Sequence, residues 1–332
     1  MKIRLAINGF GRIGRAVTRL LQQSPDLELV AINDLCDPGQ LAHALKYDSV
    51  YRGFPGKVAC EGQNLIINGS TVRVSAHAEP EKLPWQELGV QLVLETTGAF
   101  RKRAQLEGHL SAGAEKVLLA VPPKDPIDLT VVMGVNDHLI QGSEKLVSNA
   151  SCTTNAAAPV TKVLHDAFGI QRGYLNTIHA YTNGQHLIDT PHKDWRRSRA
   201  AALSIIPTTT GAAKAVAAVI PDLAGRLDGT AYRVPVPDGS IVDMLFQVSR
   251  PVTVEEVNKV LANAASGPLK GIIQYETDPI VSSDILGNGH SGIVDSQLTQ
   301  VIDGVMVKVA VWYDNEWGYS ARMVDMATRL FA

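Results

Sequence analysis

Residues 3–14 read Ile3-Arg4-Leu5-Ala6-Ile7-Asn8-Gly9-Phe10-Gly11-Arg12-Ile13-Gly14, an apolar run that leads directly into three closely spaced glycines. Apolar residues then recur at helical spacing, at Ile13, Val17, Leu20 and Leu21. This order predicts a strand, a glycine turn and a helix. A second apolar run, Leu27–Ile32, follows the helix and ends at Asn33 and Asp34.

These parts match the pattern of a dinucleotide-binding site. Gly9, Gly11 and Gly14 let the backbone approach a pyrophosphate, and the helix N-terminus faces its negative charge. Asp34 follows Gly14 at the distance at which an acidic residue accepts hydrogen bonds from the ribose hydroxyls, which favours NAD over NADP. The alternatives are a simple tight turn for the glycines and a turn-forming or helix-capping acid at Asp34.

Three further apolar runs, Leu92–Thr96, Lys116–Val121 and Val131–Val135, are typical of strands buried on both faces of a parallel sheet. The first domain is therefore predicted to be α/β with a doubly wound parallel (Rossmann) sheet. Thr97 follows one of these strands, at the carboxyl edge where such sheets bind ligands. Residues 47–85 are interpreted as hairpins inserted in this domain.

The expected strands of the second half lie closer together in the sequence, and apolar and polar residues alternate along them. This pattern favours an α+β domain with a mainly antiparallel sheet. The expected strands are Tyr174–Tyr181, Thr230–Val236, Ile241–Val248 and Val305–Tyr313, and the expected helices are Thr210–Val219 and Val254–Ala265. The predicted domains are residues 1–150 for the cofactor and 151–315 for catalysis and oligomerisation. The last helix, within residues 316–332, is expected to pack back on the first domain.

Composition excludes several classes of protein. The 332 residues are 45% hydrophobic and 19% charged, as in globular proteins, and the net charge of −2 argues against a nucleic-acid binder. The three cysteines are widely spaced, which supports neither a disulfide framework nor a metal site, and favours a cytoplasmic protein. No apolar run is long enough to cross a membrane, so no membrane association is expected.

Chemistry is expected at Ser148-Asn149-Ala150-Ser151-Cys152-Thr153-Thr154-Asn155, where a cysteine follows a strand and precedes a helical pattern. A helix N-terminus favours the thiolate, the nucleophilic form of cysteine. His179 is a candidate base because imidazole titrates in the required range. Arg233 stands alone in an apolar strand and is interpreted as an anion-binding residue. The competing interpretations are a buried core cysteine, a structural histidine and, for the cluster Arg196–Arg199, a solvated basic loop.

Together these stretches resemble one family, phosphorylating glyceraldehyde-3-phosphate dehydrogenase. The resemblance rests on Asn8–Arg15, Ser148–Asn155, His179–Thr182, Thr210–Val216 and Trp312–Glu316, and it runs through the whole chain in order. It implies NAD-dependent oxidation of glyceraldehyde 3-phosphate to 1,3-bisphosphoglycerate, with inorganic phosphate cleaving a thioester on the enzyme. It also implies a homotetramer, in which residues 181–203 form a loop between subunits.

The resemblance assigns a role to each matching residue. Cys152 would be the nucleophile and His179 its base, while Thr182 and Arg233 would hold the phosphate of the substrate. Ser151, Thr153, Thr210 and Gly211 would receive the attacking phosphate, with a contribution from Arg197. Arg12, Ile13, Asp34 and Asn315 would contact NAD.

Several positions depart from the pattern of the family. Gly184 replaces an acidic residue, Ala78 an arginine and Ala120 a hydroxyl residue, and Thr190 stands where an apolar side chain often precedes Pro191. Two other functions therefore stay open. One is an erythrose-4-phosphate dehydrogenase, in which water replaces phosphate, and the other is a non-catalytic NAD-binding interaction protein.

Overall fold

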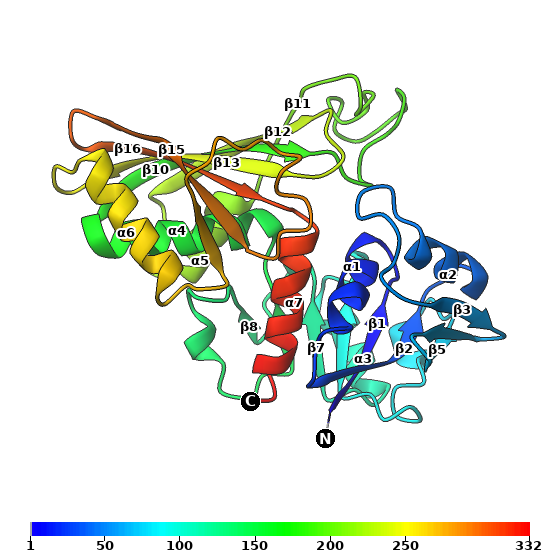
Figure 1. The fold of residues 1–332 in the computed structure, drawn as a ribbon. Helices are drawn as coiled ribbons and strands as arrows, with labels where there is room; N and C mark the ends of the chain where they lie inside the picture. The colour runs from blue at the N-terminus through cyan, green and yellow to red at the C-terminus, as the bar shows by residue number, and fades with distance from the viewer. Residues whose placement is uncertain (1) are drawn as a thin grey trace. The chain divides into compact units, whose positions relative to one another are not determined.

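A computed structural model describes residues 2–332, which divide into two compact units (Figure 1). Unit 1 comprises the described residues up to Val131, together with His138–Ser151 and Ser320–Ala332. Unit 2 comprises Val132–Asp137 and Cys152–Tyr319. The chain passes from unit 1 to unit 2 between Val131 and Val132 and again at the peptide bond before Cys152.

The sheet of unit 1 has nine strands among the described residues, in the order β3-β4-β5-β2-β1-β6-β7-β9-β8. Neighbours from β5 to β8 pair in parallel, and β3, β4 and β5 form antiparallel hairpins. The predicted doubly wound parallel sheet is confirmed. The strands are β1 (Ile3–Asn8), β2 (Leu27–Asn33), β3 (Val58–Glu61), β4 (Asn64–Ile67), β5 (Ser70–Ser75), β6 (Leu92–Glu95), β7 (Lys116–Leu119), β8 (Leu129–Thr130) and β9 (Leu146–Ser148).

Helices connect these strands in two directions. Helix α1 (Arg12–Leu21) leads from β1 to β2, and α3 (Arg103–Ser111) leads from β6 to β7. Since β1 and β6 are neighbours in the centre of the order β2-β1-β6-β7, the two connections run toward opposite edges of the sheet. Because such crossovers are right-handed, α1 and α3 cover opposite faces of the sheet. The loops after β1 and β6 therefore open at the switch point, where open sheets bind ligands. Unit 1 also contains α2 (Pro38–Lys46) and most of α7 (Trp317–Arg329).

The predicted strand at Val131–Val135 is wrong. The strand in this region is β8, which ends at Thr130. The N–H of Val132 donates to Asn136 Oδ1 over 2.8 Å, and Gly134 has a φ of +78°, so the chain turns here. A run of apolar residues cannot by itself distinguish a buried turn from a buried strand.

The sheet of unit 2 has seven strands among the described residues, in the order β11-β12-β10-β13-β16-β15-β14. It is antiparallel except for the pairs β10–β12 and β14–β15, which confirms the predicted, mainly antiparallel sheet. The strands are β10 (Ile170–Ala180), β11 (Ile206–Thr208), β12 (Leu227–Val234), β13 (Ser240–Val248), β14 (Ile273–Glu276), β15 (Gly292–Ile302) and β16 (Met306–Tyr313).

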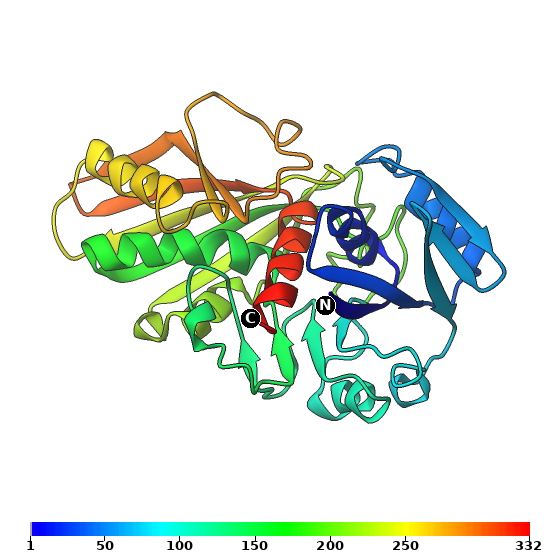
Figure 2. The same ribbon diagram turned by 60° about the horizontal axis from the view of Figure 1, so that its bottom comes forward.

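Three helices pack against this sheet. Helix α4 (Cys152–Phe168) contacts β13, β15 and β16, α5 (Ala212–Val219) contacts β10 and β12, and α6 (Val254–Ser266) contacts β14 and β15. Figure 2 shows α4 and α6 running side by side along the sheet. Strand β15, like β11 and β14, is not among the strands expected from the sequence. Its pairing with β16 shifts register between Asp295 and Gln300, and such an irregularity interrupts the alternation by which strands are recognised.

Candidate active site

A tight turn connects β9 to the helix that carries Cys152. Ala150 has a φ of +53°, a left-handed conformation that residues other than glycine rarely adopt. Its N–H donates to Ser148 Oγ over 3.0 Å, which holds the turn. Cys152 is then the first residue of α4, a helix of 17 residues, so its thiol lies at the positive end of the helix dipole.

The structure brings Cys152 and His179 together, with 3.5 Å between Sγ and Nε2. His179 lies near the end of β10, and Arg233 lies opposite it on the parallel strand β12. Because residues in register on parallel strands project to the same face, the imidazole and the guanidinium are neighbours. The residues His179 and Arg233 are 54 positions apart, and no local pattern gives the register of their strands, so the contact between their side chains follows only from the fold.

Arg233 contacts the imidazole and the backbone beside it. Its Nη1 lies 2.6 Å from His179 Nδ1 and donates to the carbonyl oxygen of Ala180 over 2.8 Å. The Nε of Arg233 is buried and has no hydrogen-bond partner among the described residues. A buried donor without a partner is costly, and a bound anion would satisfy it.

Burial and charge act in opposite directions on the thiol. Burial raises the pKa of Cys152, whereas the charge of Arg233 and the N–H of Thr153 lower it. Burial and then the charge of Arg233 lower the pKa of His179 to about 3. The imidazole is therefore neutral at pH 7, with one ring nitrogen able to accept a proton.

Tyr313, the last residue of β16, contacts both the His179 ring and the first turn of α4. Its hydroxyl lies 2.8 Å from Thr153 Oγ1, and its ring meets the His179 imidazole edge-on at 5.9 Å. Burial raises the pKa of Tyr313, so the phenol stays protonated. Ser240 Oγ accepts from the N–H of Ala180 and donates to Asn315 Oδ1 over 2.6 Å. The backbone next to His179 is thereby fixed through a hydroxyl that also holds Asn315.

Three other residues predicted to bind phosphate, Arg197, Thr210 and Gly211, lie between β10 and α5, on either side of strand β11. Arg197 Nε donates to Thr208 Oγ1 over 2.9 Å, and the charge of Arg197 further lowers the pKa of His179 and of Arg233. Thr210 Oγ1 accepts from the N–H of Ala212 in the first turn of α5, and a Cβ on Gly211 would meet no atom within 4 Å.

The remaining predicted phosphate ligands are Thr182 and Ser151. Thr182 is exposed, and its N–H donates to Gln185 Oε1 over 3.3 Å. Ser151 belongs to unit 1, whereas Cys152 and the other predicted phosphate ligands belong to unit 2.

Unit 1 contains a separate cavity of about 380 Å³ at the carboxyl edge of its sheet. Gly9 lines it with a φ of +93°, and a Cβ there would lie 2.7 Å from Thr97 Cγ2. No side chain caps the N-terminus of helix α1 at Gly11, and Gly11 itself lines the cavity, so the positive end of this helix lies at the cavity wall, where it favours an anion. Of the residues predicted for the cofactor, the cavity wall includes Gly9, Gly11, Asp34 and Thr97. These features fit a dinucleotide.

Asp34 and Arg12 already have protein partners. Asp34 Oδ2 accepts from the N–H of Phe10 over 2.7 Å, and Oδ1 accepts from the N–H of Cys36 over 3.0 Å. The carboxylate therefore both lines the cavity and holds the glycine turn. Arg12 forms an ion pair with Asp48 and lies over the ring of Tyr51.

Sequence reasoning gave no separate role to several residues of these sites. In unit 1 the cavity wall also includes Asn8, Asn33, Leu35, His77, Ala78, Thr96, Ala99 and Phe100. Asn8 and Asn33 could have been predicted from the sequence, because they are the last residues of β1 and β2, the two strands next to the glycine turn. His77 and Phe100 lie on loops and carry no periodic signal. Ala78 occupies the position at which the resemblance leads one to expect an arginine.

Residues 2–332 contain no group of three or more His, Cys, Asp or Glu side chains placed to hold a metal ion. No helix within the same residues is long and apolar enough to cross a membrane.

The chain matches two family models and many curated proteins. Residues 3–103 match the model described as "Glyceraldehyde 3-phosphate dehydrogenase, NAD binding domain", and residues 151–315 match that described as "Glyceraldehyde 3-phosphate dehydrogenase, C-terminal domain". The chain is 54% identical to the glyceraldehyde-3-phosphate dehydrogenase of Geobacillus stearothermophilus over 328 residues, 98% of each chain. It is 57% identical to the enzyme of that name from Thermotoga maritima over 324 residues, 97% of each chain.

Proposed function

The chain belongs to the glyceraldehyde-3-phosphate dehydrogenase family, and from this premise we propose that it oxidises glyceraldehyde 3-phosphate with NAD and inorganic phosphate through a thioester on Cys152. The chain is thus an NAD-dependent oxidoreductase. The observation that carries the proposed mechanism is the 3.5 Å approach of Cys152 Sγ to His179 Nε2, with Arg233 beside the imidazole. We assign NAD binding to unit 1 and the covalent chemistry to unit 2.

The first step joins the thiol to the aldehyde. Cys152 Sγ attacks the aldehyde carbon while its proton passes to His179 Nε2, and the carbonyl oxygen then takes up that proton, which gives a hemithioacetal. The neutral imidazole of His179 has a lone pair for this transfer. Thr153 and Tyr313 hold the first turn of α4, so the sulfur keeps its distance from the imidazole.

Oxidation follows at the same carbon. His179 Nε2 takes the hydroxyl proton of the hemithioacetal, and a C=O double bond forms as the hydride leaves. Bound NAD supplies the hydride acceptor. The product is a thioester of Cys152, from which an oxygen of inorganic phosphate displaces the sulfur to give 1,3-bisphosphoglycerate. Ser151, Thr153, Arg197, Thr210 and Gly211 are assigned to that phosphate.

Arg233 and Thr182 are assigned to the phosphate already on the substrate. The buried Nε of Arg233 lacks a partner among the described residues, and a phosphate oxygen would supply it. The negative charge of the phosphate would also offset the charge that lowers the pKa of His179. Binding of the correct substrate should therefore make the imidazole a stronger base.

Dependence on phosphate tests this function. NADH formation from glyceraldehyde 3-phosphate should require inorganic phosphate, and the product should be an acyl phosphate. Turnover of erythrose 4-phosphate at an equal rate without phosphate would instead identify the enzyme that uses water. Absence of turnover with both aldehydes, while NAD still binds, would identify a non-catalytic NAD-binding protein.

Replacement of Arg233 by alanine should separate phosphate recognition from chemistry. We expect catalytic efficiency with glyceraldehyde 3-phosphate to fall about a hundredfold, since charge-assisted hydrogen bonds contribute roughly 1.5–3 kcal/mol each. Efficiency with unphosphorylated glyceraldehyde should fall less than tenfold. Arg172→Ala, on the same strand as His179 but paired with Gln247, is the control and should change neither value. Equal proportional losses on the two substrates would refute the phosphate role.

Replacement of Asp34 should change the choice between NAD and NADP. A 2′-phosphate next to the carboxylate would cost a few kcal/mol, so we expect efficiency with NAD to exceed that with NADP by about a hundredfold. Asp34→Asn removes the charge and retains an acceptor oxygen for the glycine turn, and it should reduce this preference at least tenfold. Asp37→Asn is the control, since Asp37 is exposed and also accepts from a backbone N–H. An unchanged preference in Asp34→Asn would leave Asp34 with a structural role only.

A homotetramer in the cytoplasm is part of the proposal. The loop before β11 exposes large apolar side chains, with exposed fractions of 85% for Leu187, 87% for Trp195 and 83% for Leu203. The cross-strand pair Tyr174–Leu245 of β10 and β13 is also exposed. Apolar patches of this kind are typical of subunit interfaces. Light scattering should give four times the chain mass of 35.7 kDa.

A further inference from the structure

A buried glutamate is hydrogen-bonded to two residues that line the cavity of unit 1, Asn8 and Thr97, and the proposed mechanism does not use it. Glu95, the last residue of β6, is completely buried. In the parallel sheet Asn8 pairs with Glu95 on one side and with Asn33 on the other. These three side chains therefore form a row across the ends of β2, β1 and β6, the strands whose following loops surround the cavity.

Each oxygen of Glu95 accepts from two donors. Oε1 accepts from the N–H and the hydroxyl of Thr97, with 2.8 Å to the nitrogen. Oε2 accepts from Asn8 Nδ2 over 2.5 Å and from His109 Nε2 over 3.1 Å. Four hydrogen bonds from three residues therefore hold the Glu95 side chain in one orientation.

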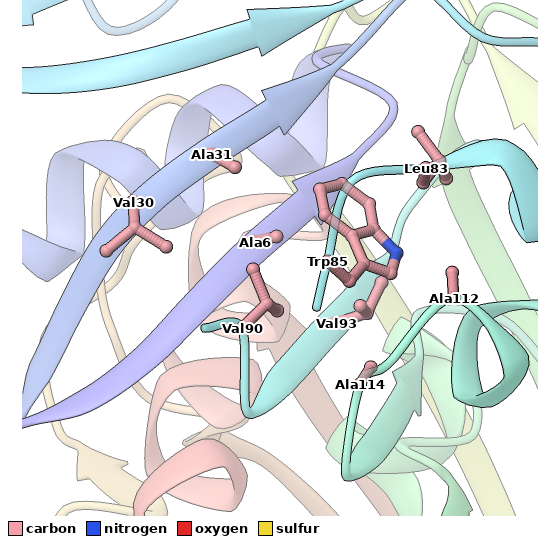
Figure 3. Close-up of a cluster of buried hydrophobic side chains, with 9 residues drawn as sticks. All are labelled: Ala6, Val30, Ala31, Leu83, Trp85, Val90, Val93, Ala112 and Ala114. Atoms are coloured by element: carbon pink, nitrogen blue, oxygen red, sulfur yellow. The ribbon is translucent and has the colours of Figure 1, made fainter. Parts of the chain in front are cut away.

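His109 and Trp85 fix the direction of these hydrogen bonds. Both side chains are completely buried. The indole N–H of Trp85 donates to His109 Nδ1 over 3.1 Å. Indole nitrogen can only donate, so Nδ1 must accept, and the imidazole hydrogen must lie on Nε2, facing Glu95. The indole itself is held in a cluster of apolar side chains that includes Ala6, Val90 and Val93 (Figure 3).

The row continues to the cavity wall on both sides. Asn33 Nδ2 donates to Asn8 Oδ1 over 2.7 Å, and Asn33 Oδ1 accepts from the N–H of His77. On the other side, Thr97 Oγ1 accepts from the N–H of Ala99 over 3.0 Å. Asn8, Asn33, His77, Thr97 and Ala99 all line the cavity, whereas Glu95, His109 and Trp85 do not contribute to its wall.

From this network we propose that Glu95 is a positioning residue for the cofactor: its side chain joins Asn8 to Thr97 and so keeps the cavity in its binding shape before NAD arrives. The loops after β1 and β6 would otherwise have to be ordered on binding, at a cost in affinity. Trp85 and His109 act indirectly: Trp85 orients the His109 ring, which in turn orients the Glu95 side chain. The inference rests on NAD binding by unit 1 and is independent of the reaction at Cys152.

Glu95→Gln tests the inference. The variant keeps the size of the side chain but places an NH2 group against donors, so at least one pair of hydrogen bonds is lost. We expect the Kd for NAD, measured by calorimetry without substrate, to rise about tenfold, and the KM for NAD to rise by a similar factor. The kcat at saturating NAD and the alkylation rate of Cys152 without NAD should change less than twofold. Glu115→Gln, an exposed glutamate of the same unit, is the control.

Several outcomes would overturn the inference. They are a Kd within twofold of that of the natural protein, or a loss of kcat and of Cys152 reactivity with an unchanged Kd. If Glu95→Gln does not fold, Trp85→Phe provides the test, because it removes one hydrogen bond of the relay and keeps an aromatic ring in the cluster. It should raise the Kd for NAD two- to threefold, and an unchanged Kd would contradict the relay. Calorimetry with NAD needs no turnover, so its result is separable from failure of the proposed reaction.

Discussion

Replacement of Cys152 by serine should lower the rate of NADH formation from glyceraldehyde 3-phosphate by about 10⁴-fold or more, the scale seen when a catalytic nucleophile is removed. A serine hydroxyl is far harder to ionise than a thiol, and the single charge of Arg233 and the dipole of α4 cannot make up the difference. NAD binding should be unchanged, because the cavity that we assign to NAD is built from residues of unit 1.

The other two cysteines supply matched controls. Cys36 and Cys60 are both exposed, and both belong to unit 1, whereas Cys152 belongs to unit 2. Cys36→Ser and Cys60→Ser should therefore retain nearly full activity, and iodoacetamide should inactivate both variants at the natural rate. Residual activity above one per cent in purified Cys152→Ser would contradict a covalent mechanism.

The replacement His179→Asn should lower kcat by roughly 10²–10⁴-fold, the usual contribution of a general base. The amide retains a polar group at this position but cannot accept and return a proton. Because the pKa of His179 without substrate lies at about 3, the imidazole of the free enzyme is neutral throughout pH 5–9, and loss of its lone pair should lower kcat/KM across that whole range. Steady-state assays over this range measure the effect.

A double variant shows whether the two residues act as a unit. In Cys152→Ser/His179→Asn the loss should be close to that of Cys152→Ser alone, since residues of one catalytic unit have strongly non-additive effects. His138→Asn, an exposed histidine of unit 1, is the control for an imidazole-to-amide change. Additive losses in the double variant would show that His179 acts independently of the thiol.

The fold of unit 1 was predictable because its signals are local. The glycine turn after β1 and the apolar periodicity of α1 lie within 19 residues, from Ile3 to Leu21, and they require no knowledge of distant contacts. The prediction of a strand at Val131–Val135 was wrong because it too relied on local composition, which could not reveal the turn around Gly134. Local patterns identify elements well where a periodicity is present and poorly where a short apolar run has none.

The sites were only partly predictable because they are assembled by register. Cys152 could be singled out from its position before a helical pattern, but its distance from His179 depends on the packing of α4 against the sheet. The pairing of His179 with Arg233, and that of Asn8 with Glu95, follow from strand pairing that no local pattern specifies. Glu95 offered a further difficulty, since a charged residue at the end of an apolar run is usually interpreted as the exposed end of a strand.

The left-handed turn at Ala150 has a consequence for variation in this protein. A non-glycine residue at a φ of +53° costs about 1–2 kcal/mol, and glycine would relieve that strain. Glycine would also enlarge the range of conformations open to the peptide two residues before the sulfur. Stability therefore favours glycine at position 150, whereas a rigid turn favours alanine. Selection for heat resistance alone would favour glycine, which holds the Cys152 thiol less firmly in position.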